Sequence, residues 1–115
     1  MKLVKSYEKD TRSIFFMKIF DEVFTSLYYP WKIEELEVVL GEEGYVEFDE
    51  ITKKAKISFN YEHDFIKDMD ERGIKSLILH ALYSLILKIS GMRYDKFFAR
   101  NEEEKRIIKA MENFV

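Results

Sequence analysis

Hydrophobic positions near the start of the chain recur at helical spacing. Between Thr11 and Tyr29, apolar residues at positions 16, 19, 20, 23, 24 and 27 follow a helical period, which predicts a helix over this range. Pro30 is expected to stop that helix, because the residue before a proline is pushed out of the helical region. The following segment, Trp31 to Leu40, predicts an extended strand.

Alternating hydrophobic positions in the middle of the chain predict a β-hairpin. Residues 41–44 contain two glycines and predict a turn. The segments 45–48 and 55–59 then place Val46 and Phe48 on one face of the first strand, and Ala55, Ile57 and Phe59 on one face of the second. The polar connection 49–54 is short enough to join them as a hairpin.

A second helix is predicted to begin after Asp68 or Asp70, either of which can cap it, and to run to about Ser90. Apolar residues surround most of its circumference, so we expect it to be the most buried element. Gly91 is expected to end it.

A third helix is predicted from Tyr94, or restarted at Asn101, where Asn101 and Glu104 have capping-box spacing. The expected order is therefore helix, three strands, helix, helix. We expect an α+β fold. An N-terminal helix precedes a small three-stranded antiparallel or mixed sheet with a hairpin, and two C-terminal helices then pack on one face of that sheet.

Composition restricts the chain to one compact domain over residues 1–115. It has 115 residues, 47% hydrophobic, with a formal net charge of -3, which suits a folded core and not a disordered segment. The longest nearly uncharged apolar run, Leu77 to Leu87, is far shorter than the ~20 residues that cross a bilayer. The N-terminus has no apolar signal region, so we expect no membrane association and a cytoplasmic location.

Several chemistries are excluded or disfavoured by residue usage. Cysteine is absent, which removes disulfides and sulfur-bound zinc. Glutamine is also absent, and Lys and Glu dominate the charge, a bias reported for thermophilic proteins. The one basic cluster, Lys53, Lys54 and Lys56, is interpreted as a solvated turn, so nucleic acid is not an expected partner. We expect no cofactor.

One polar line marks the second helix as the candidate site. Ser76, His80, Ser84 and Lys88 recur every four residues on an otherwise apolar helix. The simpler interpretation is that this is the face nearest water, with His80 a hydrogen-bonded side chain. His63, between two acidic residues on a segment interpreted as solvated loop, does not change this picture, and we expect no metal site.

The order of a strand pair, an apolar helix with a central His, and a Glu-bearing helix resembles the minimal zincin metallopeptidases of the gluzincin type. In that family the helix carries H-E-x-x-H, in which two His bind zinc and the Glu is the general base; a Glu from a later helix is the third ligand. The same window here reads His80-Ala81-Leu82-Tyr83-Ser84. The resemblance therefore implies a vestigial pocket formed by His80, Ser84 and Glu104.

The departure from the motif predicts a protein that is not an enzyme. Ala81 replaces the general base and Ser84 replaces the second zinc ligand, so the usual three protein ligands of a catalytic zinc are not available. We expect a non-catalytic small domain of zincin-like layout that acts as a binding or interaction module.

A homo-oligomeric structural or interaction protein, unrelated to peptidases, is the alternative interpretation. Aromatic residues make up 16% of the chain and concentrate in and just after the first helix. Its apolar arc is wider than one packed face needs, so we expect a homodimer or another protein partner to use Phe16, Phe20 and Phe24 as an interface.

Overall fold

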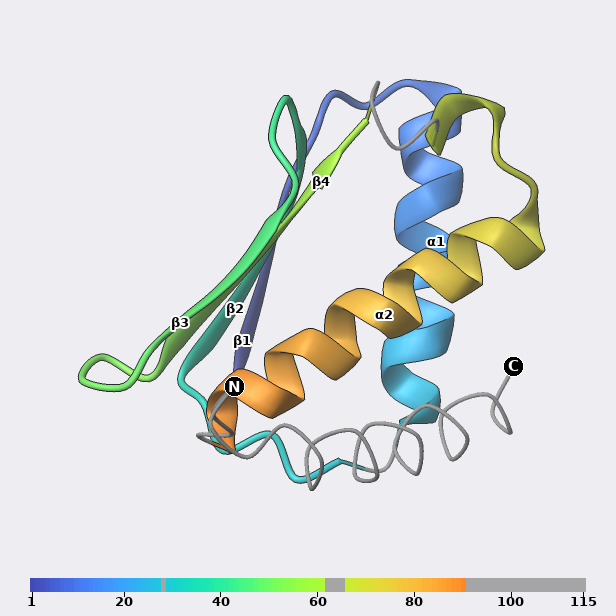
Figure 1. Ribbon diagram of the computed structural model, residues 1–115. Coiled ribbons are helices and arrows are strands. Elements are labelled where there is room, and N and C mark those ends of the chain that lie inside the picture. Colours follow the sequence, from blue (N-terminus) through green and yellow to red (C-terminus); the bar gives the residue numbers. More distant parts are fainter. Residues whose placement is uncertain (28, 62–65, 91–115) are drawn as a thin grey trace.

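The computed structural model describes residues 1–27, 29–61 and 66–90, which form a mixed sheet with helices packed on one of its faces (Figure 1). The elements in chain order are β1 (Lys2–Ser6), α1 (Thr11–Ser26), β2 (Glu35–Gly41), β3 (Tyr45–Asp49), β4 (Lys54–Asn60), the short 3-10 helix η1 (Ile66–Asp68) and α2 (Glu71–Ile89). The strand order is β1-β2-β4-β3, with β1, β2 and β4 parallel and β3 antiparallel to β4. The expected α+β class and the hairpin are confirmed, but the sheet has four strands where three were expected.

Strand β1 is the element that the hydrophobic pattern did not predict. It is five residues long, and only Leu3 and Val4 in it are apolar. It pairs in parallel with β2, and a parallel pair needs a crossover connection, which α1 provides. Lys5 points to the helix side of the sheet, where its ammonium group lies 2.6 Å from the Asp21 carboxylate of α1.

Helix α1 begins where expected and ends three residues before the expected boundary. The side chain of Asp10 caps it by accepting a hydrogen bond from the backbone N–H of Ser13 at 2.8 Å. The helix ends at Ser26, because Leu27 takes an extended conformation and packs into the core at 9% exposure. Pro30 therefore lies beyond the end of the helix and does not set it.

The connection from β2 to β3 passes over the end of β4, since β4 lies between those two strands in the sheet. Polar groups of β4 hold this connection in place. The Ser58 hydroxyl donates to the carbonyl of Glu43 at 2.6 Å, and the Asn60 amide donates to the carbonyl of Glu42 at 2.7 Å. Ser58 lies on the outer face of the sheet and is buried beneath this connection.

Replacing Ser58 by alanine should lower the free energy of unfolding by about 1 kcal/mol, because the substitution removes one buried hydrogen bond and leaves the Glu43 carbonyl without that donor. Urea titration followed by circular dichroism measures the loss. Ser6→Ala is the matched control, since Ser6 is exposed and its hydroxyl makes only a 3.4 Å contact with Glu37. Equal stability of the two variants would contradict a structural role for the Ser58 hydroxyl.

Helix α2 is the central element, as the all-round apolar pattern indicated. Asp70, one of the two candidate caps, accepts a hydrogen bond from the backbone N–H of Gly73 at 2.8 Å. Ile74, Ile78 and Leu82 on this helix have no exposed surface. The buried residues of α1, α2 and the inner face of the sheet form one core cluster. The expected third helix lies outside the described residues.

Candidate functional site

The proposed vestigial pocket is described only in part. His80 lies exposed on α2 and Ser84 lies one turn further along the same face, half-buried. Glu104 lies outside the described residues. Within residues 1–27, 29–61 and 66–90, no three His, Asp or Glu side chains come together in a group that could hold a metal ion. Because His80 is exposed and Ser84 is only half-buried, the polar line of α2 faces away from the core.

The assignment of Phe16 and Phe20 to an interface is wrong. Both side chains are 0% exposed in the single chain. Phe16 packs edge-on against Phe59 of β4 with ring centroids 4.9 Å apart, and Phe20 stacks on Phe24 at 5.7 Å. Only Phe24 is partly exposed, and it stacks in turn on Trp31. Phe16 and Phe20 are thus covered by the same chain, and of the three residues assigned to the interface only Phe24 keeps exposed surface.

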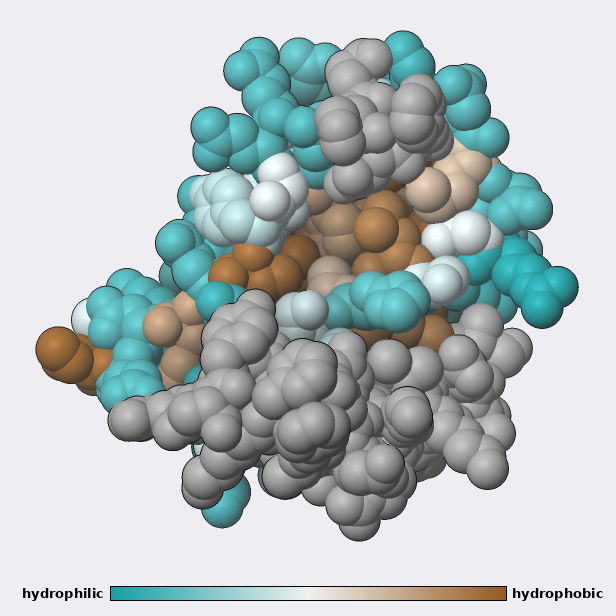
Figure 2. Space-filling model, viewed as in Figure 1, coloured by the Kyte–Doolittle hydropathy of each residue, from teal (hydrophilic) through white to brown (hydrophobic). Residues whose placement is uncertain are grey.

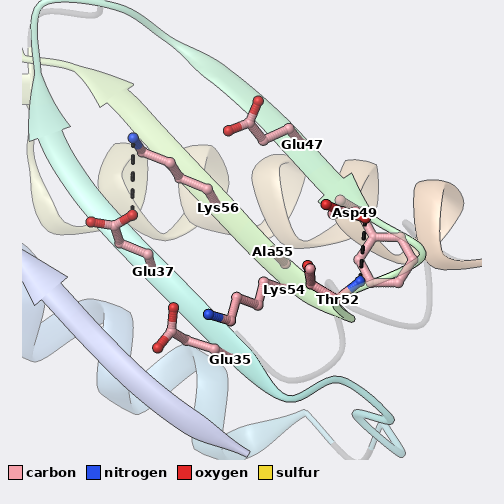
Figure 3. A pocket seen from close by; sticks show the side chains of 9 residues that line it. Glu35, Glu37, Glu47, Asp49, Thr52, Lys54, Ala55 and Lys56 are labelled. Carbon is pink, nitrogen blue, oxygen red and sulfur yellow. Dashed lines mark hydrogen bonds and ion pairs between the residues drawn. The ribbon is translucent and has the colours of Figure 1, made fainter.

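The face of the sheet opposite the helices carries charged side chains in columns of alternating sign. Acidic residues point outward from β2 (Glu35 and Glu37), basic residues from β4 (Lys54 and Lys56) and acidic residues from β3 (Glu47 and Asp49), as Figure 3 shows. The strand register places these opposite charges directly beside one another, with Glu35 next to Lys54 and Glu47 next to Lys56. Such cross-strand pairs of opposite charge stabilise a sheet modestly.

These side chains line an open depression of about 500 Å³ on the outer face of the sheet. Lys56 forms an ion pair with Glu37 at 3.9 Å, and its ammonium group lies 5.6 Å from the ring centroid of Tyr45. Hydrogen bonding to Tyr45 raises the pKa of Lys56, and the carboxylates of Glu37 and Glu47 act in the same direction. Lys56 is therefore a cation throughout the physiological range.

Asp49 serves the hairpin turn as well as the charged face. Its carboxylate accepts hydrogen bonds from the backbone N–H groups of Ile51 at 2.8 Å and Thr52 at 3.3 Å. These two bonds lower the pKa of Asp49, because they stabilise the ionised form. Lys53 completes the turn with a positive φ of 59°. The carboxylate of Asp49 is thus partly committed to local structure.

The basic cluster seen in the sequence does not form a single solvated turn. Only Lys53 lies in the turn, whereas Lys54 and Lys56 lie on β4 and project from the outer face of the sheet between acidic side chains. The surrounding carboxylates leave no basic surface there for phosphate groups.

Strand β3 is the free antiparallel edge of the sheet. It pairs with β4 on one side, and no strand of the described residues pairs with it on the other. An edge strand presents unpaired backbone N–H and C=O groups at alternate residues. Val46 and Phe48, which face the helices, stay half-buried, and α2 packs against β3. Apolar surface is visible between the sheet and the helices in Figure 2.

The sequence carried a signal for the charged outer face of the sheet that the hydrophobic pattern alone does not reveal. Acidic residues occur two positions apart in β2 and again in β3, and lysines occur two positions apart in β4. The spacing places each pair on one face of a strand. The strand order, which makes β3 an edge, is not readable from any such spacing.

Comparisons of the chain with protein-family models, with curated proteins and with solved structures find no match. No helix among the described residues is both long and apolar enough to cross a bilayer.

Proposed function

We propose that the protein is a non-catalytic binding module of zincin-like layout, which holds an extended segment of another polypeptide along the free edge of β3. The observation that carries the proposal is the combination on β3 of an unpaired strand edge with two half-buried apolar side chains, Val46 and Phe48, beside α2. The zincin-like layout is supported by the antiparallel pair β3 and β4, which is followed in the chain by η1 and then by α2, with His80 near the middle of α2.

Addition of a strand to a sheet edge is a common mode of peptide recognition. The backbone groups of the edge give affinity, and the alternate side chains select the sequence that is bound. On β3 the side chains facing the helices are apolar, so an added strand would bury its own apolar residues next to Val46, Phe48 and α2. Burial of apolar area supplies free energy that backbone hydrogen bonds alone do not.

The proposal excludes peptide-bond hydrolysis at this edge. His80 is the only histidine on α2, and Ala81 follows it where a general base would be required. Without a base and with one imidazole, neither a zinc ion nor an attacking water is held in the usual way.

We expect no zinc-dependent peptidase activity. Unfolded casein incubated with the protein and added zinc should remain intact by gel electrophoresis and mass spectrometry, and zinc should not raise the melting temperature. The matched control is His80→Ala, which should behave as the unchanged protein does. Casein cleavage that His80→Ala abolishes would contradict the proposal.

A capped six-residue peptide that alternates threonine with valine tests the binding itself. Titration into the isotopically labelled protein, followed by amide NMR, should give saturable shifts, and the peptide should be recovered uncut. Val46→Ala removes apolar surface from the proposed site and should weaken this binding, whereas Val4→Ala on the outer face of β1 should not. Absence of any shift up to millimolar peptide would refute the proposal.

A further inference from the structure

We infer that the segment held at β3 carries basic residues at alternate positions, on the face of the sheet opposite the helices, with apolar residues between them. This inference rests on the proposed function, because it names the chemistry of the segment bound at the same edge. It is drawn from the order of charges across the sheet and from the surroundings of Glu47.

Charge alternates in sign from strand to strand along one row of the sheet. The row begins at Lys2 of β1 and continues through Glu35 of β2 and Lys54 of β4 to Asp49 of β3. Every neighbouring pair in it has opposite charge, and the row ends at the free edge on an acidic residue. A basic residue on an added strand would continue the alternation, since residues directly opposite each other lie on the same face.

Glu47 ends a second row at the free edge, which runs through Glu37 of β2 and Lys56 of β4. Lys56, its neighbour on β4, forms its ion pair with Glu37 on the other side, at 3.9 Å. Among the residues that the structure describes, Glu47 makes no ion pair and its side chain is exposed. Figure 3 shows its carboxylate on the β3 side of Lys56. Glu47 is therefore the carboxylate at this edge that is available to a bound cation.

The two faces of β3 together specify an alternating segment. Glu47 and Asp49 are two residues apart and point outward, while Phe48 between them points toward the helices and is half-buried. The matching order on an added strand is basic, apolar, basic. Strand β1 of a second copy fits less well, because its outward positions are Lys2, Val4 and Ser6. These supply one positive charge, whereas β3 presents two carboxylates.

Three capped six-residue peptides test the inference, alternating valine with lysine, with threonine or with glutamate. Amide NMR titration should place the lysine peptide above the threonine peptide in affinity and the glutamate peptide last. Each cross-strand charge pair is expected to change affinity by roughly 1.4- to 5-fold. Glu47→Lys should remove the preference for the lysine peptide, and Glu22→Lys, which makes the same change in net charge on exposed α1 surface, should retain it.

The outcomes separate the inference from the function on which it rests. Equal affinity for the three peptides would overturn the inference and leave edge binding in place, whereas failure of all three to bind would refute both. Light scattering in the absence of peptide tests whether a second copy of the chain occupies the β3 edge. Self-association that Glu47→Lys abolishes would show that a second copy takes this edge and would overturn the inference.

Discussion

Replacing Phe20 by glutamate should prevent the chain from folding. The side chain is 0% exposed and stacks on Phe24 inside the core. A carboxylate at this position would lose its hydration without gaining a partner, and the lost aromatic contacts add to that cost. A destabilisation beyond about 4 kcal/mol is expected, which is comparable with the whole stability of a domain of this size. Loss of the helical circular dichroism signal at neutral pH measures it.

Ile14→Glu is the matched control for Phe20→Glu, because it places the same charge on the same helix at a position that is 50% exposed. It also lies near the N-terminus of α1, where a negative charge interacts favourably with the helix dipole. We expect this variant to stay folded and to change stability by no more than about 0.5 kcal/mol. A folded Phe20→Glu variant that becomes monomeric from a wild-type oligomer would contradict the core assignment.

Replacing Leu82 by alanine should lower the free energy of unfolding by roughly 2–5 kcal/mol. Leu82 is fully buried in the middle of α2, where its removal leaves a cavity that the surrounding core cannot close. Urea titration monitored by circular dichroism measures the change in midpoint. The slope of the transition should stay constant if the denatured state is unaffected.

Leu77→Ala on the same helix is the comparison for Leu82→Ala. Leu77 is only half-buried, so the same change should cost less than half as much, because less surface is lost from the core. A loss below about 1 kcal/mol for Leu82→Ala, or equal losses for the two variants, would show that the middle of α2 is not tightly packed.

Local patterns predicted α1, α2 and the hairpin because these elements depend on neighbouring residues. The start of α1 and the pairing of β3 with β4 follow from spacing and side-chain type, and these also limited the cap of α2 to Asp68 or Asp70, of which the structure has Asp70. Strand β1 was missed because Leu3 and Val4 are too short a signal. The end of α1 was misplaced because the packing of Leu27 into the core, and not Pro30, decides it.

The candidate site was less predictable, since it depends on strand order. No spacing in the sequence shows that β4 lies between β2 and β3, and this order alone makes β3 an edge. The interface expected at Phe16 and Phe20 failed for a related reason. A wide apolar arc on a helix indicates burial, but it does not tell whether the same chain or a second chain provides the cover. Here the cover includes Phe59 of β4.

The central claim is that β3 is the edge where an extended polypeptide segment binds, and backbone hydrogen exchange of the labelled protein tests it most directly. Exchange of the β3 amides should slow when the valine and lysine peptide is added, because amides that faced water become hydrogen-bonded. Amides of β1, the other edge of the sheet, should exchange as before, and the peptide should remain uncut. Unchanged exchange along Tyr45–Asp49 with a bound peptide, or protection confined to Lys2–Ser6, would contradict the account.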